Sequence, residues 1–268
     1  MIEKSAKTAE RLAMFKNEKT LQALLVVVVF ILVVGFWETS VRLWQVPAYL
    51  LPPPSLIFYQ LVRLIKSALF WDNLGVTMAE VLLGYVCGIV LAAILGVAIS
   101  QVRVFQLALL PYIIAFQTIP TVALAPIFLQ WFGYGIASKI VMAALISFFP
   151  MLINVIAGLQ SAGREEIQML KAFGANEIQI LLKVKLPASL PFVFAGLGLG
   201  IIFALIGAIV AEFVGAQKGL GKMLMQFNEQ FNIAGQFAIL VILALIGVIM
   251  HLMVGFAKHR IIFWDGQR

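Results

Sequence analysis

The sequence predicts an all-α polytopic membrane protein with six transmembrane helices. Hydrophobic residues make up 63% of the 268 amino acids and charged residues only 12%, whereas soluble domains carry roughly 25% charged residues. Long apolar runs recur along the chain, and a helix needs about 20 such residues to cross a bilayer core. Because only helices and closed barrels satisfy their backbone in lipid, and these runs exceed the length of barrel strands, they indicate helices.

Polar or basic breaks separate the predicted spans. The six spans are approximately 21–37, 74–99, 105–132, 136–156, 190–210 and 237–256. One transmembrane domain therefore covers residues 20–257, between a basic amphipathic segment at 1–19 and a tail at 258–268. The first span is expected to be retained, because residues 35–39 offer no small-x-small cleavage pattern.

The distribution of positive charge predicts the orientation. With the N-terminus inside, cytoplasmic segments hold 13 of the 19 lysines and arginines, as the positive-inside rule requires. Both termini are therefore expected in the cytoplasm, on the inner side of a bacterial plasma membrane. The net charge of +7 is spread among tails and loops, so it does not favour nucleic-acid binding.

A proline-rich segment follows the first span. Prolines 52–54 favour a stiff connector. Ser55 is expected to cap a short helix whose apolar face includes Leu56, Tyr59 and Val62. In the second span, Gly84 and Gly88 form a small-xxx-small step that predicts a close helix contact.

The cytoplasmic segment at 161–187, here called the coupling segment, is amphipathic, basic and rich in turn signals. Ile167, Leu170 and Phe173 recur every three positions and predict a short helix. Gly174 is expected to end it in a turn. A second short helix should follow, ended by Pro187 and Pro191, which start the fifth span. An exposed segment of this kind suits a soluble partner.

Within this segment, Gly174, nine residues and then Val184-Lys185-Leu186-Pro187 resemble part of the cytoplasmic signature of ATP-binding-cassette importer permeases. The full signature opens with Glu-Ala-Ala, where this chain has Gln168, Met169 and Leu170. Four further blocks are similar to the sulfonate, taurine, nitrate and pyrimidine-precursor permease subfamily. They are LPPPS, QTIPTVALAPIFLQWFGYG, SFFPMLINV and AEFVGAQKGLG, in that order along the chain.

The resemblance implies a type I importer permease fold and a transmembrane permease subunit that moves a small solute into the cytoplasm by alternating access. The implied partners are an identical permease copy, two ATP-binding subunits and an extracytoplasmic solute-binding protein. The implied solute is a sulfonate, taurine, a nitrate-like anion or a pyrimidine or vitamin precursor. The residues implied in coupling to the ATPase are Gln168, Leu170, Phe173, Gly174, Ala175, Leu186 and Pro187.

The chain is not expected to be an enzyme. The closest approach to a phosphate-binding loop is residues 215–223, where Ala216 replaces the first glycine and Met223 replaces Ser or Thr. ATP and magnesium are therefore expected in partner subunits, and no cofactor in this chain. His251 and His259 lack clustered carboxylates or cysteines, so no metal site is expected.

Polar residues within spans predict the translocation pathway, because each is costly in lipid. Gln117, Thr118 and Thr121 surround Pro120 in a helix that should be broken. Ser147 and Asn154, in the fourth span, are further candidates. For these residues, solute contact and satisfaction of a kinked backbone remain equal alternatives.

Two carboxylates complete the candidate set. Glu212, at the end of the fifth span, forms part of an outer gate or is a surface-exposed helix end. Glu80 takes a paired structural role near the outer surface, or contacts solute or protons.

Two other classes of protein remain as alternatives. A secondary transporter, working without an ATPase, would show two similar halves and a charged relay. A membrane enzyme would need a cluster of nucleophile, base or metal ligands. Neither pattern is visible in the sequence.

Overall fold

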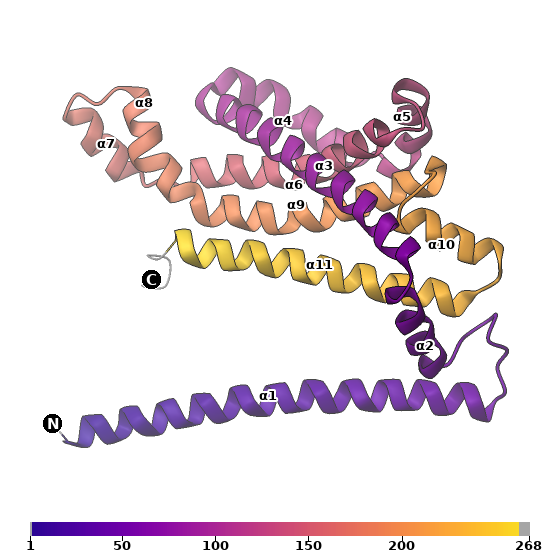
Figure 1. Ribbon diagram of the computed structural model, residues 1–268. Helices are drawn as coiled ribbons and strands as arrows, with labels where there is room; N and C mark the ends of the chain where they lie inside the picture. Colours follow the sequence, from indigo (N-terminus) through magenta and orange to yellow (C-terminus); the bar gives the residue numbers. More distant parts are fainter. Residues whose placement is uncertain (1, 263–268) are drawn as a thin grey trace.

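The computed structural model describes residues 2–262, except for the side chains of residues 2–20, Ala23 and Arg103. Helices make up all regular secondary structure in this range (Figure 1). They are α1 (Ile2–Leu43), α2 (Pro54–Ile65), α3 (Ala68–Gln101), α4 (Arg103–Gln117), η1 (Thr121–Leu124), α5 (Ala125–Phe132), α6 (Ile136–Gln160), α7 (Arg164–Ala172), α8 (Glu177–Ile180), η2 (Leu181–Lys185), α9 (Leu186–Gly215), α10 (Leu220–Glu229) and α11 (Ile233–Ile261). The predicted all-α fold is confirmed.

Five helices among the described residues are long and apolar enough to cross a membrane, and six spans result if one bent pair counts as a single span. The bent pair is α4 with η1 and α5, and the two halves meet at 89°. Pro120, which has no N–H to continue the ladder of α4, lies at this bend. The broken third span that the prolines predict is therefore confirmed.

The core is a layer of three long helices in which α6 lies between α3 and α9. Glycines allow this close packing. A Cβ at Gly84 of α3 would lie 2.5 Å from the Ala143 Cβ of α6, and one at Gly207 of α9 would lie 2.8 Å from the Ala143 Cα. A Cβ at Gly88 would meet the Ser147 Oγ at 2.5 Å. The predicted contact through Gly84 and Gly88 is thus confirmed, and its partner is α6.

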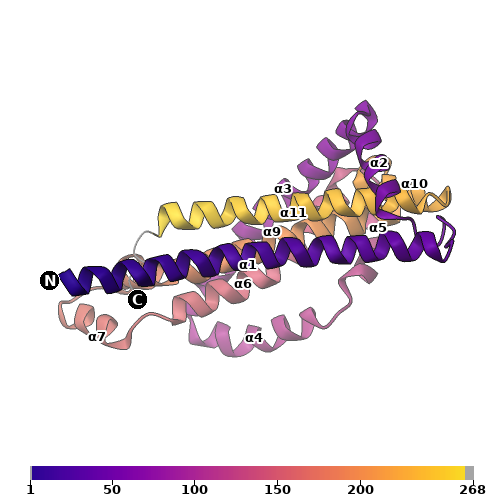
Figure 2. The ribbon, with the colours of Figure 1, turned by 90° about the horizontal axis from the view of Figure 1, so that it is seen from below.

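The molecule has two distinct ends. The start of α1, the end of α11 and the helices α7 and α8 lie at one end, and α2, α5 and α10 lie at the other (Figures 1 and 2). This grouping is the one that the positive charges predict for the cytoplasmic and outer sides. Residues 263–268 of the predicted tail lie outside the described residues.

Helix α1 stands apart from the bundle and is attached near its end. Only 6% of its most apolar window is buried. The Trp37 ring contacts that of Phe237 at 5.7 Å. The Glu38 carboxylate accepts hydrogen bonds from the Ser55 N–H (2.9 Å) and from the Ser55 hydroxyl (2.8 Å). Residues 2–19 of the predicted N-terminal segment form the first part of α1, and their side chains lie outside the described residues.

One prediction about α2 is wrong. Ser55 does not cap the helix, because Pro53 is the N-cap and the Ser55 hydroxyl is bonded to Glu38. The buried face carries Ile57 and Leu64, while Tyr59 is exposed. Contact with the core decides which face is buried, and helical spacing alone did not reveal that contact.

Candidate functional site

A cavity opens where the third span is broken, and we call it the break cavity. Its volume is about 560 Å³, within the usual range for small-molecule sites. The walls are formed by the bend between α4 and η1, by α6 and by α9. The lining residues are Gln117, Thr118, Ile119, Pro120, Thr121, Val122, Ile146, Phe149, Pro150, Ile153, Asn154 and Phe203.

The structure brings several of the predicted pathway residues together. Gln117, Thr118 and Thr121 all line the break cavity. Ser147 does not, because it is fully buried, donates its hydroxyl to the Ala144 carbonyl and packs against α3. Glu212 also lies elsewhere, in the cluster described next. Asn154, which the sequence offered beside Ser147, does line this cavity, whereas sequence reasoning did not select Phe203.

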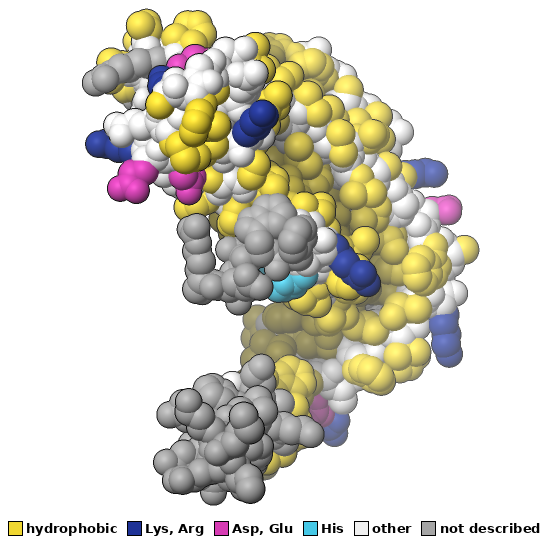
Figure 3. Space-filling model, turned by 90° about the vertical axis from the view of Figure 1, so that its left-hand side faces the viewer, with side chains coloured by type: hydrophobic (Ala, Val, Ile, Leu, Met, Phe, Trp, Pro, Cys, Tyr) yellow, Lys and Arg dark blue, Asp and Glu magenta, His cyan; other side chains and the backbone are white. Residues whose placement is uncertain are grey.

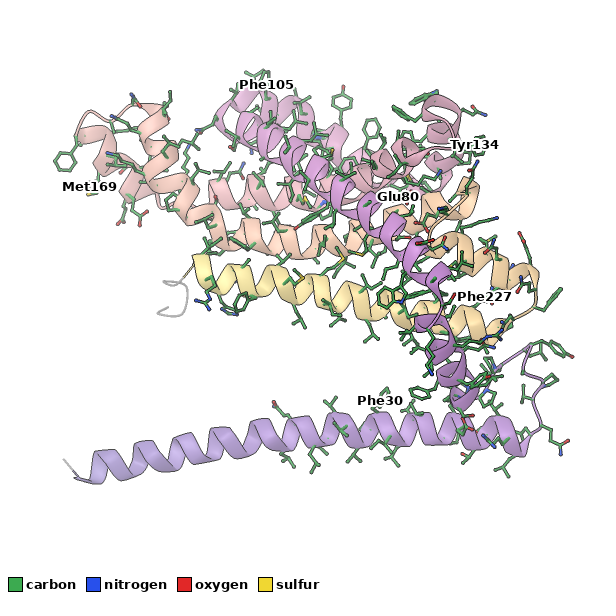
Figure 4. All side chains as sticks on the ribbon, in the orientation of Figure 1. Phe30, Glu80, Phe105, Tyr134, Met169 and Phe227 are labelled. Atoms are coloured by element: carbon green, nitrogen blue, oxygen red, sulfur yellow. The ribbon has the colours of Figure 1, made fainter. Side chains whose placement is uncertain are left out.

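A buried polar cluster joins α3 to the connection between α9 and α10. We call Asn73, Thr77, Glu80, Lys139 and Glu212 the carboxylate cluster. Figure 4 marks Glu80 where α3 crosses the bundle. Glu80 and Glu212 are 2% and 1% exposed, so Glu212 is not the surface-exposed helix end that one interpretation offered.

Glu212 holds this cluster together through both carboxylate oxygens. It accepts hydrogen bonds from the Thr77 hydroxyl (2.6 Å) and the Gly221 N–H (2.5 Å), and the buried Glu80 carboxyl lies beside it. Thr77 in turn accepts from the Leu220 N–H at 2.8 Å. Glu80 is therefore buried beside a second carboxyl, as the paired structural interpretation expects, although its Oε2 has no hydrogen-bond partner among the described residues.

Two further side chains, those of Asn73 and Lys139, fix the same connection. The Gly219 N–H donates to the Asn73 side chain at 2.7 Å, and a Cβ at Gly219 would overlap the Glu212 carboxylate. Lys139 is 1% exposed, and its ammonium donates to the carbonyls of Tyr134, Gly135 and Gly215. Sequence reasoning treated Lys139 only as a topological charge, although its place in the first turn of a span was a signal.

The connection between α7 and α8 in the coupling segment consists of a glycine turn and a helix cap. The Gly174 N–H donates to the Lys171 carbonyl (2.9 Å) and the Ala175 N–H to the Leu170 carbonyl (3.0 Å), which is the Schellman arrangement at the end of a helix. Gly174 has a φ of +79°, as the predicted glycine turn requires. Asn176 and Gln179 then form a capping box that starts α8.

The second half of the segment differs from the prediction. Pro187 and Pro191 do not end the short helix, because α8, the π-helical turn η2 and α9 form one continuous helix from Glu177 to Gly215. The Leu186 N–H donates to the Leu181 carbonyl, and this wider turn lets the helix pass Pro187, which has no N–H of its own. The Lys185 ammonium also bonds the Gln101 side chain of α3 at 2.6 Å.

The coupling segment presents apolar side chains to its surroundings. Phe173 is 81% exposed and Ile178 is 67% exposed. Gln168 and Gly174 are also exposed, whereas Leu170, Ala175, Leu186 and Pro187 are half-buried. Figure 3 views this end of the molecule and shows charged side chains around the hydrophobic ones, and Figure 4 marks Met169 at its tip.

A hollow lies behind this exposed tip. Its volume is about 770 Å³, and Leu170, Lys183, Val184 and Pro187 are among the residues that line it. The predicted coupling residues thus all lie in the coupling segment, some exposed at its tip and some at the hollow behind the tip.

Comparison with known proteins gives a consistent family. The profile of the family described as binding-protein-dependent transport system inner membrane component matches residues 84–263. The riboflavin transport system permease protein of Chloroflexus aurantiacus is 36% identical over 90% of this chain and 90% of its own length. The formylaminopyrimidine transport permease protein of Halalkalibacterium halodurans is 36% identical over 87% of this chain and 92% of its own.

A solved structure supports the same fold. A chain of the methionine ABC transporter MetNI, in an inward-facing conformation, superposes with a TM-score of 0.62. The match covers 72% of this chain and 94% of that one, at 23% sequence identity. At this identity the likeness shows the fold.

Proposed function

The chain belongs to the family of inner membrane components of binding-protein-dependent transport systems, and from this premise we propose that it is the permease subunit of an ATP-driven importer. It moves a small solute from an extracytoplasmic binding protein to the cytoplasm by alternating access. The solute class is a sulfonate, taurine, a nitrate-like anion or a pyrimidine or vitamin precursor. Two ATP-binding subunits hydrolyse ATP, and this chain carries no catalytic residue.

The exposed tip of the coupling segment carries the proposal. Large apolar side chains such as Phe173 and Ile178 are costly to leave in water, since burying one contributes about 1.5–3 kcal/mol. Phe173 directly follows α7 and Ile178 lies in α8, and both helices are at the same end as the start of α1 and the end of α11 (Figure 1). The positive charges favour the cytoplasm for this end. A groove on an ATP-binding subunit is the partner that would bury this tip.

The continuous helix Glu177–Gly215 connects the coupling segment to the break cavity. It begins in the coupling segment, forms one wall of the break cavity at Phe203 and ends in the carboxylate cluster at Glu212. From Leu186 to Phe203 the axial distance is about 26 Å at ~1.5 Å per residue. Because a continuous helix transmits displacement along its length, motion of the docked tip would reach the cavity wall directly.

The solute pathway is proposed to run through the break cavity. The cavity opens at the surface of this chain, where Gln117, Thr118 and Pro120 are exposed. An identical copy facing this side would enclose the pathway between two such cavities. The break also leaves carbonyls without the N–H partners that a continuous helix would offer, which is tolerated in membranes where they line a cavity.

The energy source tests this proposal against a secondary transporter. Uptake would be measured in the host bacterium with the gene for this chain deleted and then restored. Arsenate, which depletes ATP, should abolish the uptake that depends on this chain, whereas a protonophore that collapses the proton gradient at maintained ATP should leave it. Chain-dependent uptake that is resistant to arsenate and sensitive to the protonophore would refute the proposal.

A further inference from the structure

The basic end of the coupling segment is joined to the corner between α3 and α4. The Lys185 ammonium donates a hydrogen bond to the side-chain oxygen of Gln101 at 2.6 Å. Gln101 is the last residue of α3, and after Val102 the chain turns into α4. Among the residues whose side chains the structure describes, this is the one hydrogen bond that joins the coupling segment to α3 or α4.

The surroundings of this bond favour a lasting contact. Both side chains are half-buried, and a hydrogen bond from an ammonium is stronger than one between neutral groups. Lys185 is the last residue of the π-helical turn η2, and single turns of this kind occur frequently at functional sites. The bond therefore ties the base of the coupling segment to the start of α4.

Two walls of the break cavity are connected to the coupling segment in different ways. The α9 wall belongs to the continuous helix that starts in this segment. Helix α4, which carries Gln117 to the cavity, lies at the side of the bundle (Figure 2). Its described side chains are exposed except for Gln106, Leu110 and Ile113, and the last two pack against an apolar cluster of α3 and α6. No continuous helix leads from the coupling segment to α4.

We propose that Lys185 is a positioning residue that passes the displacement of the coupling segment to α4 through Gln101. The α4 wall of the break cavity then moves together with the α9 wall. From Arg103 to Gln117 the axial distance is about 21 Å at ~1.5 Å per residue, so a shift at the corner is carried along α4 to the cavity. This inference rests on the proposed importer function.

The test follows α4 and α9 separately in the assembled importer. A Cys87→Ser permease is reconstituted in nanodiscs with cysteine-free ATP-binding subunits and spin-labelled at one position, Leu107→Cys on α4 or Leu199→Cys on α9. Both native side chains are exposed. Double electron–electron resonance then measures the distance between the labels of the two permease copies, without nucleotide and with ATP and vanadate.

The variants remove the bond and then restore it. Lys185→Gln removes the ammonium, Gln101→Lys brings two ammonium groups together, and the exchange variant carries both substitutions and can form the bond in the reverse direction. Lys66→Gln is the control, because it removes one ammonium at the end of α2, at the opposite end of the molecule. Co-purification of the ATP-binding subunits is measured for every variant, so that a loss of docking is recognised.

In the unsubstituted background, nucleotide should shift the distance populations at both Leu107→Cys and Leu199→Cys. Lys185→Gln and Gln101→Lys should each reduce the nucleotide-induced change in the population ratio on α4 by about 10-fold, and should leave the change on α9 and the docking of the ATP-binding subunits intact. The exchange variant should recover the change on α4, and Lys66→Gln should behave as the unsubstituted chain.

Four results would overturn the inference and leave the importer function standing. They are a nucleotide-induced shift on α9 with none on α4, a shift on α4 that persists in both single variants, a loss on both helices in the single variants, and a loss on α4 that the exchange variant does not recover. If the unsubstituted chain binds no ATP-binding subunit, or nucleotide shifts neither helix, the proposed function itself is refuted.

Discussion

Replacing Gly174 by valine should weaken coupling to the ATPase through the backbone alone. Gly174 has a φ of +79°, and a Cβ built there meets no heavy atom within 4 Å. A Cβ therefore overlaps no neighbour, and the left-handed backbone is what disfavours an L-residue, by about 1–2 kcal/mol. Since 1.4 kcal/mol is a factor of ten, the weight of the docking-competent turn should fall by about 5- to 30-fold.

The apparent affinity for the ATPase subunit should fall by the same factor, because binding requires the native turn. The assay is titration of purified ATPase subunit onto permease in nanodiscs, together with ATP-dependent uptake in cells. Gly174→Asn is the matched control, since asparagine tolerates this backbone conformation, and it should bind close to the wild type. Equal affinity for the valine and wild-type chains would refute the argument that this turn positions the docking surface.

Three further outcomes are expected. Thr77→Val should lower the Tm of the purified permease, because it breaks two buried hydrogen bonds, one of them to Glu212. Each group left unpaired costs about 1–3 kcal/mol of stability. Thr77→Ser should keep the wild-type Tm, and equal Tm values for Thr77→Val and the wild type would contradict the role given to the carboxylate cluster. Gly84→Leu should destabilise the chain by about 1–3 kcal/mol through overpacking, with Gly84→Ala intermediate in urea titrations of detergent-solubilised protein. Phe173→Ser should reduce co-purification of the ATPase subunit at an unchanged amount of permease in the membrane. Phe58→Ser, at a side chain that is also exposed but lies at the opposite end, should not. Loss in both variants would point to a general defect.

The sequence predicts the helices well because their signal is local. Apolar runs locate the long helices, the prolines locate the bend near Pro120, and Gly174 locates the turn of the coupling segment. The same local signals fail where tertiary contacts decide. Helical spacing does not show which face of α2 packs against the core, and nothing in the sequence pattern marks the π-helical turn that accommodates Pro187.

In the candidate site too, residues with a local sequence signal were predicted and residues brought in by tertiary packing were not. Gln117, Thr118 and Thr121 were found because they flank a proline break within one segment. Phe203 reaches the same cavity from a helix about 85 residues away, and an apolar residue in an apolar span gives no signal of its own. Lys139 and Thr77 meet Glu212 only through the packing of α3, α6 and α9.

The account is tested most directly by cross-linking from the tip of the coupling segment. Phe173→Cys would be prepared in a Cys87→Ser background, which removes the one native cysteine, and labelled with a membrane-impermeant maleimide that carries a photoreactive group. The account predicts labelling only from the cytoplasmic side and, on illumination, a covalent adduct with an ATP-binding subunit. Labelling of intact cells from outside, or an adduct pattern without any ATP-binding subunit, would contradict it.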